Sequence, residues 1–285
     1  MSQPAINDLN ICIATENGSG SASSNSILFK SIFKMGIPCS GKNMFPSNIQ
    51  GLPTWYQIRA SADGYLGRKD AIDMMVIFND ATAHQDVDKV RAGGMVLYDD
   101  STPLAKGLIR DSLKYIGVPA WNLVKEHIKV TQLRAKQRNM IYVGAIAKLF
   151  GIPLPIVSEV LTDTFKDKQA VIDSNFQCIE LGYQHIESSG ATQDLCRLQV
   201  IPDGNRGKIM TEGNTVAALG AIYGGCSVVA WYPITPSSSL VEEMIARGPD
   251  LRVDPHGKHR YAIVQAEDEL ASAAMVVGAG FCGAR

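Results

Sequence analysis

Short apolar runs alternate with stretches of helical periodicity along the first two thirds of the chain. Runs of strand length occupy residues 10–14, 56–60, 74–78 and 95–98. After the first run, apolar residues recur at helical spacing from Ile27 to Met35, and Gly36 and Pro38 mark the end of that helix. Strands that alternate with helices are typical of a mostly parallel sheet covered on both faces, so the pattern predicts an α/β fold.

Helical periodicity then dominates residues 132–150 and 156–185. These helices are expected to close a first domain of residues 1–190. Turn-forming residues with little apolar periodicity follow, which predicts a linker over residues 191–212.

A second alternating unit follows the linker. Its pattern predicts a helix from Gly213 through Ile222, a strand at 227–232, a helix at 237–247, a strand at 261–265 and a last helix from Asp268. Ser239 and Glu242 have the spacing of a capping box. Gly248 and Pro249 are expected to end the helix that they follow.

The second unit is short for a domain of its own. About 70 residues with two strands are fewer than an α/β layer usually needs to enclose a core. Residues 213–285 are therefore expected to be the N-terminal part of an incomplete domain. Either the chain is a fragment or another polypeptide completes this domain.

The composition is that of a globular protein without a strongly charged partner. Hydrophobic residues make up 46% of the 285 positions, and 27 basic against 28 acidic residues leave a formal net charge of −1. Such a chain creates no global field that attracts nucleic acid or an anionic membrane. No apolar run reaches the roughly 18 residues of a membrane span, and residues 1–9 lack the features of a signal peptide. A cytoplasmic protein with no nucleic-acid or membrane partner is expected.

The cysteines and histidines are scattered. The six cysteines contain no CxxC pair, whereas iron–sulfur and structural zinc sites need soft ligands at short spacings. The thiols are expected to be reduced, as in other cytoplasmic proteins. His256 and His259 lie in a polar turn and are expected to face solvent. No metal site is predicted on this chain.

Two glycine-rich segments imitate nucleotide-binding loops. Gly18 and Gly20 follow the first strand in a pattern close to GxGxxG, but Ser23 replaces the last glycine and no acidic residue stands where a ribose would need it. Residues 36–43 imitate a P-loop, but they follow a helix and end in Asn43 instead of a magnesium-binding hydroxyl. No Gly-x-Ser-x-Gly nucleophile elbow occurs. An NAD-binding Rossmann protein stays as an alternative.

A proline-rich turn follows the first strand of the second unit. Pro233 and Pro236 stiffen the segment Tyr232–Ser239. Thr235 lies between them, at the carboxyl end of a strand, where α/β sheets bind their ligands. An ordinary proline-stiffened start of a helix would show the same pattern.

Three consecutive acids follow the second strand of this unit. Glu267, Asp268 and Glu269 lie at a strand-to-helix junction, where the helix dipole favours negative charge, so capping alone could explain them. Their neighbours, among them Leu270 and Ala271, are apolar or small. At least one of the acids is therefore expected to be partly buried, with a tuned pKa.

These segments resemble the 2-oxoacid:acceptor oxidoreductases, thiamine-diphosphate enzymes that oxidise 2-oxo acids to acyl-CoA and reduce ferredoxin. The resemblance is carried by residues 232–238 and 267–272, and by residues 16–21, 41–43 and 45–56. The order is like that of the fused alpha subunit of 2-oxoglutarate-type members, a gamma domain followed by a pyrimidine-binding domain. The resemblance covers nearly the whole chain and implies truncation inside the pyrimidine-binding domain. The turn at residues 16–21 holds fewer glycines than the family's usual turn.

The resemblance also implies roles for single residues. Glu269 matches the catalytic acid that hydrogen-bonds the aminopyrimidine ring of thiamine diphosphate, and Glu267 is its expected neighbour in binding the cofactor. Thr235 matches the residue that meets the carboxyl end of the 2-oxo acid. Pro233 and Ile234 complete the expected cofactor-binding set.

The loop residues Ser47, Asn48 and Gln50 are expected to approach the substrate or CoA. In the family, the magnesium ion of the diphosphate and the iron–sulfur cluster lie on a beta subunit, so the resemblance implies an α2β2 assembly. CoA, ferredoxin and a 2-oxo acid are the other implied partners. The architecture favours 2-oxoglutarate as the substrate, with pyruvate next, in the oxidative or the reductive direction.

A noncatalytic assembly module of the same complex is the other alternative. Glu269 favours catalysis, because a scaffold does not need a carboxylate at that position.

Overall fold

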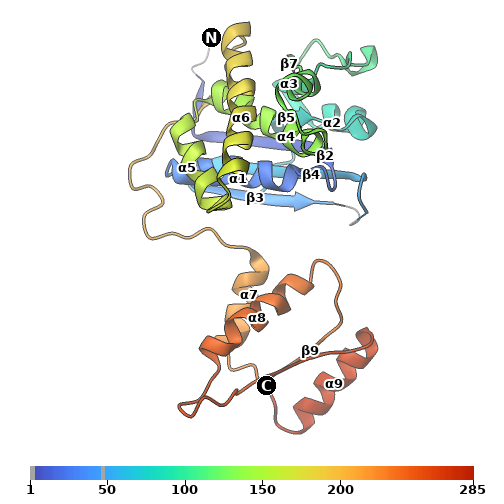
Figure 1. Cartoon of the computed structure of the whole chain (residues 1–285), viewed down its shortest axis with the longest axis vertical. Coiled ribbons are helices and arrows are strands. Elements are labelled where there is room, and N and C mark those ends of the chain that lie inside the picture. Colours follow the sequence, from blue (N-terminus) through green and yellow to red (C-terminus); the bar gives the residue numbers. More distant parts are fainter. Residues whose placement is uncertain (1–3, 46–48) are drawn as a thin grey trace. The chain divides into compact units, whose positions relative to one another are not determined.

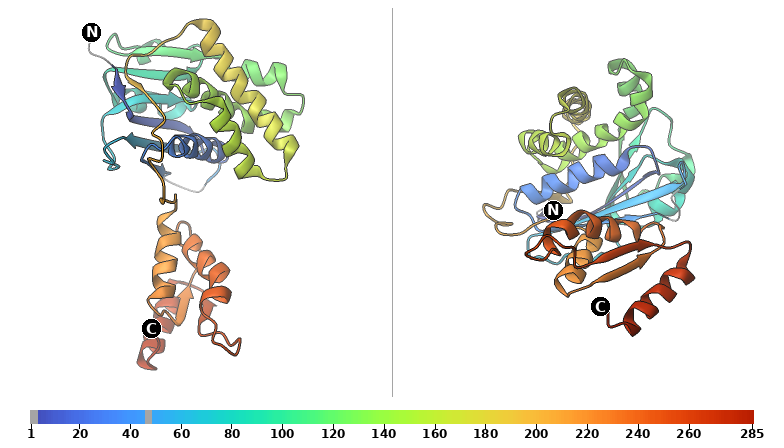
Figure 2. Two further views of the ribbon diagram at one scale, coloured as in Figure 1. Left: turned by 90° about the vertical axis from the view of Figure 1, so that its left-hand side faces the viewer. Right: turned by 60° about the horizontal axis from the view of Figure 1, so that its bottom comes forward.

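The chain forms two compact units, Met1–Lys208 and Ile209–Arg285 (Figures 1 and 2). The structure is a computed structural model that describes residues 4–45 and 49–285. Each unit combines helices with strands that are mostly parallel, which confirms the predicted α/β class.

The described part of the first unit contains a six-stranded sheet in the order β3-β4-β2-β5-β6-β7. Its strands are β2 (Asp8–Glu16), β3 (Cys39–Met44), β4 (Pro53–Ser61), β5 (Ile72–Ile77), β6 (Val90–Asp99) and β7 (Lys114–Val118). Strands β2, β5, β6 and β7 run parallel, and β3 and β4 form an antiparallel hairpin beside β2. The apolar pattern does not predict β3, because its residues are mostly polar and an edge strand need not be buried.

Helices cover both faces of this sheet (Figure 1). One face carries α1 (Ser21–Lys34), α3 (Ala120–His127), α4 (Thr131–Phe150), α5 (Leu154–Phe165) and α6 (Gln169–Ser189). The other face carries α2 (Ala83–Asp88), which is flanked by the short helices Asp80–Thr82 and Lys106–Leu108. Alternate residues of β2 divide between the two cores, with Ile11 and Ile13 on the first face and Cys12 and Ala14 on the second.

Two glycines let α4 and α6 pack with their backbones in close contact. A Cβ atom added to Gly144 would collide with the carbonyl oxygen of Ile179, and one added to Gly182 would collide with that of Ile141. Each helix therefore carries a glycine where the other helix passes. The polar N-terminal half of α4 reaches the carboxyl edge of the sheet, where Arg138 donates to the carbonyl oxygen of Phe78.

Residues 191–208 pack on the first unit, although the sequence predicts a linker there. The strand β8 (Cys196–Arg197) pairs with β1 (Ala5–Ile6). The backbone nitrogen of Leu198 donates to Phe150, and that of Ile201 donates to Met35. Cys196 and Leu198 are buried. The segment lacks periodicity because its hydrogen bonds go to distant parts of the chain, and the division between units falls after Lys208.

The second unit holds a two-stranded parallel sheet and three helices in its described residues. Its elements are α7 (Gly213–Tyr223), β9 (Val228–Trp231), α8 (Ser238–Leu251), β10 (Ala262–Gln265) and α9 (Glu269–Phe281). Ala218, Ile222 and Met244 form its buried core. No residue of α9 is buried. The unit thus leaves much of its apolar surface uncovered.

Two local predictions for α8 are wrong. Ser239 does not cap the helix: the N-cap is Ser237, and the hydroxyl of Ser239 donates to the carbonyl oxygen of Pro236. The helix also continues through Gly248 and Pro249 to Leu251. Gly248 lies buried against the ring of Tyr261, where a side chain would not fit.

Candidate functional site

The carboxyl ends of β9 and β10 lie side by side. The strands are parallel, with Gln265 opposite Trp231, and the backbone nitrogen of Ala266 donates to the carbonyl oxygen of Trp231 over 2.8 Å. The segments that follow both strands therefore leave the sheet at the same edge. This edge brings Thr235 and Glu269 into one region, as expected for a site at the carboxyl end of a parallel sheet.

The proline-rich turn is held by its backbone and leaves its side chains outside. The carbonyl oxygen of Ile234 accepts hydrogen bonds from the hydroxyl of Ser237 over 2.8 Å and from the nitrogen of Ser238 over 3.2 Å. Pro233, Ile234 and Thr235 are exposed. Within the described residues, the hydroxyl of Thr235 has no hydrogen-bond partner, so it is available to a ligand.

The three acids at the start of α9 are all exposed, so the prediction of a partly buried acid is wrong. Asp268 is the N-cap, and its carboxylate accepts from the nitrogen of Ala271 over 2.7 Å. The apolar neighbours do not shield the three acids from solvent, because Leu270 is itself 82% exposed. The carboxylates of Glu267 and Glu269 make no hydrogen bond or ion pair with other described residues. Both carboxylates are therefore free to bind a ligand.

Asn214 is a site residue that the sequence analysis did not find. It lies in the first turn of α7, and its Nδ2 atom donates to Pro236 O over 2.8 Å and to Ser239 Oγ over 2.7 Å. An asparagine at the beginning of a helix usually indicates only a cap. The contact with the turn, 22 residues away, exists only in the folded unit.

The first unit has a second polar region, at the glycine turn between β2 and α1. Gly18 and Gly20 adopt φ angles of 82° and 85°, which favour glycine. The amide of Asn139 on α4 donates to the carbonyl oxygen of Ser19 over 2.9 Å. No side chain caps α1, and no acid lies in its first turn. The turn is thus anchored from outside, and no acidic residue in the first turn of α1 offsets the positive end of the helix dipole.

Gln50 lies against this turn. A Cβ atom on Gly18 would come within 2.7 Å of the Cγ atom of Gln50. The nitrogen of Asn17 donates to Leu52, and that of Gly51 donates back to Asn17. These backbone hydrogen bonds therefore hold residues 49–52 against the glycine turn. Ser47 and Asn48, which the sequence analysis grouped with Gln50, lie outside the described residues.

Several buried polar atoms near the carboxyl edge of the sheet have no hydrogen-bond partner. They include Thr15 Oγ1, Asn79 Nδ2 and Asn139 Oδ1, whereas Asp99 Oδ2 forms an ion pair with Arg138 Nη1 over 3.9 Å. Native proteins leave few such atoms unpaired. Arg138 completes the region: it donates to the carbonyl oxygen of Phe78 over 2.9 Å, and its guanidinium group lies 5.3 Å and 5.2 Å from the ring centres of Phe78 and Trp121. This edge is suited to a polar ligand.

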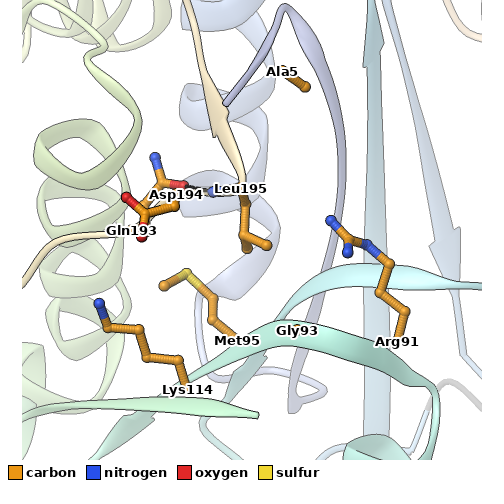
Figure 3. A pocket seen from close by; sticks show the side chains of 8 residues that line it. All are labelled: Ala5, Arg91, Gly93, Met95, Lys114, Gln193, Asp194 and Leu195. Atoms are coloured by element: carbon orange, nitrogen blue, oxygen red, sulfur yellow. Dashed lines mark hydrogen bonds between the residues drawn. The ribbon is translucent and has the colours of Figure 1, made fainter. Parts of the chain in front are cut away.

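An open hollow of about 420 Å³ lies near the amino ends of β6 and β7 (Figure 3). Arg91 on one side is paired with Asp73, and the amide of Gln193 is bonded to Leu149 and Cys196. Lys114 and Asp194, which also line the hollow, carry opposite charges. Neither side chain has a hydrogen-bond or ion-pair partner among the described residues. This mixture selects no class of ligand, and no residue of the predicted site lines the hollow.

The P-loop imitation is excluded by the fold. Gly41 and Lys42 lie within β3 and pair with β4, so the segment is a strand and not a phosphate-binding turn. In residues 4–45 and 49–285, no group of three or more histidine, cysteine or acidic side chains could hold a metal ion. No described helix is long and apolar enough to cross a membrane.

Family models match both units. Residues 10–185 match the model of pyruvate ferredoxin/flavodoxin oxidoreductase. Residues 219–285 match the thiamine-diphosphate-binding model of pyruvate flavodoxin/ferredoxin oxidoreductase.

Curated relatives extend the match along nearly the whole chain. The alpha subunit of 2-oxoacid:ferredoxin oxidoreductase 2 from Aeropyrum pernix is 26% identical over 98% of this chain and 50% of its own length. The 2-oxoglutarate synthase subunit KorA from Archaeoglobus fulgidus is 40% identical over 26% of this chain and 19% of its own length. The chain spans about half the length of the first of these relatives.

A solved structure is similar over the same range. The 2-oxoglutarate:ferredoxin oxidoreductase from Magnetococcus marinus, with 2-oxoglutarate, coenzyme A and succinyl-CoA bound, has a TM-score of 0.81 and 28% identity. The match covers 98% of this chain and 46% of that chain. Pyruvate oxidoreductase subunit PORC from Thermotoga maritima shares the fold over 62% of this chain and 96% of its own, with a TM-score of 0.51 and 19% identity.

Proposed function

The chain belongs to the pyruvate ferredoxin/flavodoxin oxidoreductase family, and from this we propose that it works as the alpha subunit of a thiamine-diphosphate-dependent 2-oxoacid:ferredoxin oxidoreductase. The activity is the CoA-dependent oxidative decarboxylation of a 2-oxo acid to acyl-CoA and CO2, or its reverse. The observation that carries the proposal is the common edge of β9 and β10, where Thr235 and Glu269 are both exposed. That edge lies in the part that matches the thiamine-diphosphate-binding model.

The residues at this edge fit the aminopyrimidine half of the cofactor. Glu269 offers a carboxyl group without a partner among the described residues, and a carboxyl group is what the ring nitrogen N1′ requires. Glu267 is exposed beside it, and Pro233 and Ile234 offer apolar surface on the neighbouring turn. When bound, thiamine diphosphate supplies the carbon nucleophile that the chain itself lacks. Glu269 would hold a proton at N1′, and Thr235 would orient the substrate.

The remaining parts of the site are assigned to a beta subunit. We propose that Mg²⁺ and the diphosphate contacts, as well as the iron–sulfur cluster that reduces ferredoxin, lie on that partner. The alpha-subunit names of the relatives support such a partner, and an α2β2 assembly in the cytoplasm is the simplest form of this proposal.

The first unit is proposed as the gamma domain and as the part that contributes to CoA binding. Its carboxyl edge combines the uncapped start of α1, the side chain of Gln50 against Gly18 and several unpaired polar atoms. Amide and hydroxyl groups of this kind suit the phosphates and amides of CoA. The Magnetococcus marinus enzyme, which contains CoA, supports this assignment.

The proposed substrate is 2-oxoglutarate, with pyruvate as the second choice. The relatives named for 2-oxoglutarate support this order. The second unit is proposed as the N-terminal part of the pyrimidine-binding domain, and its match to the thiamine-diphosphate-binding model supports this assignment.

The test is an assay of the full-length chain assembled with its beta subunit. We expect reduction of ferredoxin that requires a 2-oxo acid, CoA, Mg²⁺ and thiamine diphosphate together, with a higher kcat/KM for 2-oxoglutarate than for pyruvate. An assembly that forms normally and binds the cofactor, yet turns over no 2-oxo acid, would contradict the catalytic proposal and favour an assembly module.

A further inference from the structure

We infer that Asn214 is the positioning residue of Thr235. From the first turn of α7, it holds the proline-rich turn at the carboxyl end of β9. The inference rests on the proposed function, because it takes Thr235 as the residue that meets the 2-oxo acid.

The contacts of Asn214 are specific. Its side-chain amide has two N–H groups, and Nδ2 lies at hydrogen-bond distance from two acceptors, Pro236 O at 2.8 Å and Ser239 Oγ at 2.7 Å. One acceptor belongs to the turn and the other to the first turn of α8. Within the described residues, no other side chain from outside the turn and α8 hydrogen-bonds to the turn.

The other hydrogen bonds of the turn are local. The carbonyl oxygen of Ile234 is held by Ser237 and Ser238, and that of Pro236 also accepts the hydroxyl of Ser239. All of these partners lie three or four residues further along the chain. Such bonds set the shape of the turn, but they move with it and do not set its place in the unit.

Asn214 fixes the position of the turn relative to the rest of the unit. The helix that carries it packs against α8 through Ala218, Ile222 and Met244. The amide therefore links the turn to the small core of the unit. The carbonyl groups on both sides of Thr235 are occupied, whereas its hydroxyl is free. This arrangement fixes the backbone of Thr235 and leaves its side chain for the substrate.

Asn214 is only half-buried and lies outside the core. Its replacement is therefore expected to change the position of the turn without unfolding the unit. In Asn214→Ala both hydrogen bonds are lost. In Asn214→Asp the shape is kept, but the carboxylate cannot donate to Pro236 O. Comparison of the two variants separates the effect of losing the packing of the side chain from the effect of losing its hydrogen-bond donor.

The experiment uses the full-length chain assembled with its beta subunit. The matched control is Asn122→Ala, since Asn122 is an exposed asparagine in the first turn of α3 and its side chain makes no hydrogen bond with described residues. Hydrogen exchange is measured by mass spectrometry over residues 232–242. KM for the 2-oxo acid, kcat and the affinity for thiamine diphosphate are measured on the same samples.

For Asn214→Ala and Asn214→Asp we expect faster exchange over residues 232–242 and a loss of about tenfold in kcat/KM, mostly through KM for the 2-oxo acid. The affinity for thiamine diphosphate should change by less than about twofold, and Asn122→Ala should match the wild type in every readout. Unchanged exchange in both Asn214 variants, or equal losses of substrate and cofactor binding, would overturn the inference. A wild-type assembly without 2-oxo acid turnover would refute the proposed function, whereas unchanged exchange would refute the link made by Asn214.

Discussion

Two free carboxylates lie two positions apart at the start of α9, and the proposed function gives them different roles. Glu269→Gln keeps the shape and a hydrogen-bonding side chain, but an amide cannot hold the proton at N1′ of the cofactor. We expect kcat to fall on the order of 10²-fold or more. Cofactor affinity should change much less, because the diphosphate contacts are assigned to the partner. Steady-state kinetics and calorimetric titration of the assembled enzyme measure both quantities.

Glu267→Gln is the matched control, since Glu267 is equally exposed and also has no partner in the described part of the chain. We expect a clearly smaller effect on kcat. Equally mild effects of the two substitutions would refute the assignment of Glu269 as the catalytic acid.

The cysteines should differ strongly in reactivity. Burial raises the pKa of Cys12, Cys39 and Cys178 to about 12 and that of Cys196 to about 11. The thiolate is the reactive form, so these four thiols should remain unreactive at pH 8. Cys282 is exposed. An alkylating reagent followed by peptide mass spectrometry should label Cys282 first.

Cys282→Ser is the control for this measurement and should remove the fast phase of labelling. Labelling of Cys12, Cys39, Cys178 and Cys196 should become fast only when the first unit unfolds, or when the pH approaches their raised pKa values. Rapid labelling of Cys12 or Cys178 in the folded chain at pH 8 would contradict the buried positions of these thiols.

At the level of elements, the contact between α4 and α6 depends on its two glycines. Gly144→Ala places a methyl group against the backbone of α6 at Ile179. The gain in helix propensity is about 1 kcal/mol, while overpacking costs about 1–3 kcal/mol and more when backbone must move. We therefore expect a net loss of stability of the first unit in thermal or denaturant unfolding.

Gly220→Ala is the comparison, because Gly220 also lies within a helix but has open space where the methyl group would go. This substitution should leave the second unit as stable as before or stabilise it by up to about 1 kcal/mol. A Gly144→Ala variant that is as stable as the wild type would show that α4 and α6 can separate at no cost.

At the level of the whole molecule, the two units should differ in how readily they open. The sheet of the first unit is buried on both faces, whereas α9 has no buried residue and Phe281 is 90% exposed. Few buried contacts mean a low free energy of local opening. Amide exchange of this chain alone should be much faster beyond residue 213 than in residues 11–14 or 74–78.

Assembly with the beta subunit provides the control for this measurement. If the partner covers the exposed apolar surface of the second unit, exchange beyond residue 213 should slow on assembly, while exchange in the first unit should not change. Equal protection of the two units in the isolated chain would contradict this prediction.

Much of the fold could be predicted from local patterns. The apolar runs that became β2, β4, β5 and β6 and the order of elements in the second unit needed only periodicity and turn residues. The polar strand β3 was missed, because its place is set by pairing with β4 and not by burial of its own side chains. The continuation of α8 through Pro249 to Leu251 was missed because a Gly-Pro pair is a strong local signal for the end of a helix.

The sequence by itself determined which chemical groups the site can use. The proline-rich turn with Thr235 and the acids around Glu269 are local motifs, and their types and spacing do not depend on the rest of the chain. The tertiary structure decided what these groups meet. Parallel pairing of the strands placed both motifs at one edge of the sheet, and the packing of the unit left all three acids exposed to solvent. It also brought Asn214 into contact with the turn, 22 residues away. Such contacts join residues that are distant in sequence, and only the packing of helices and strands brings them within hydrogen-bond distance.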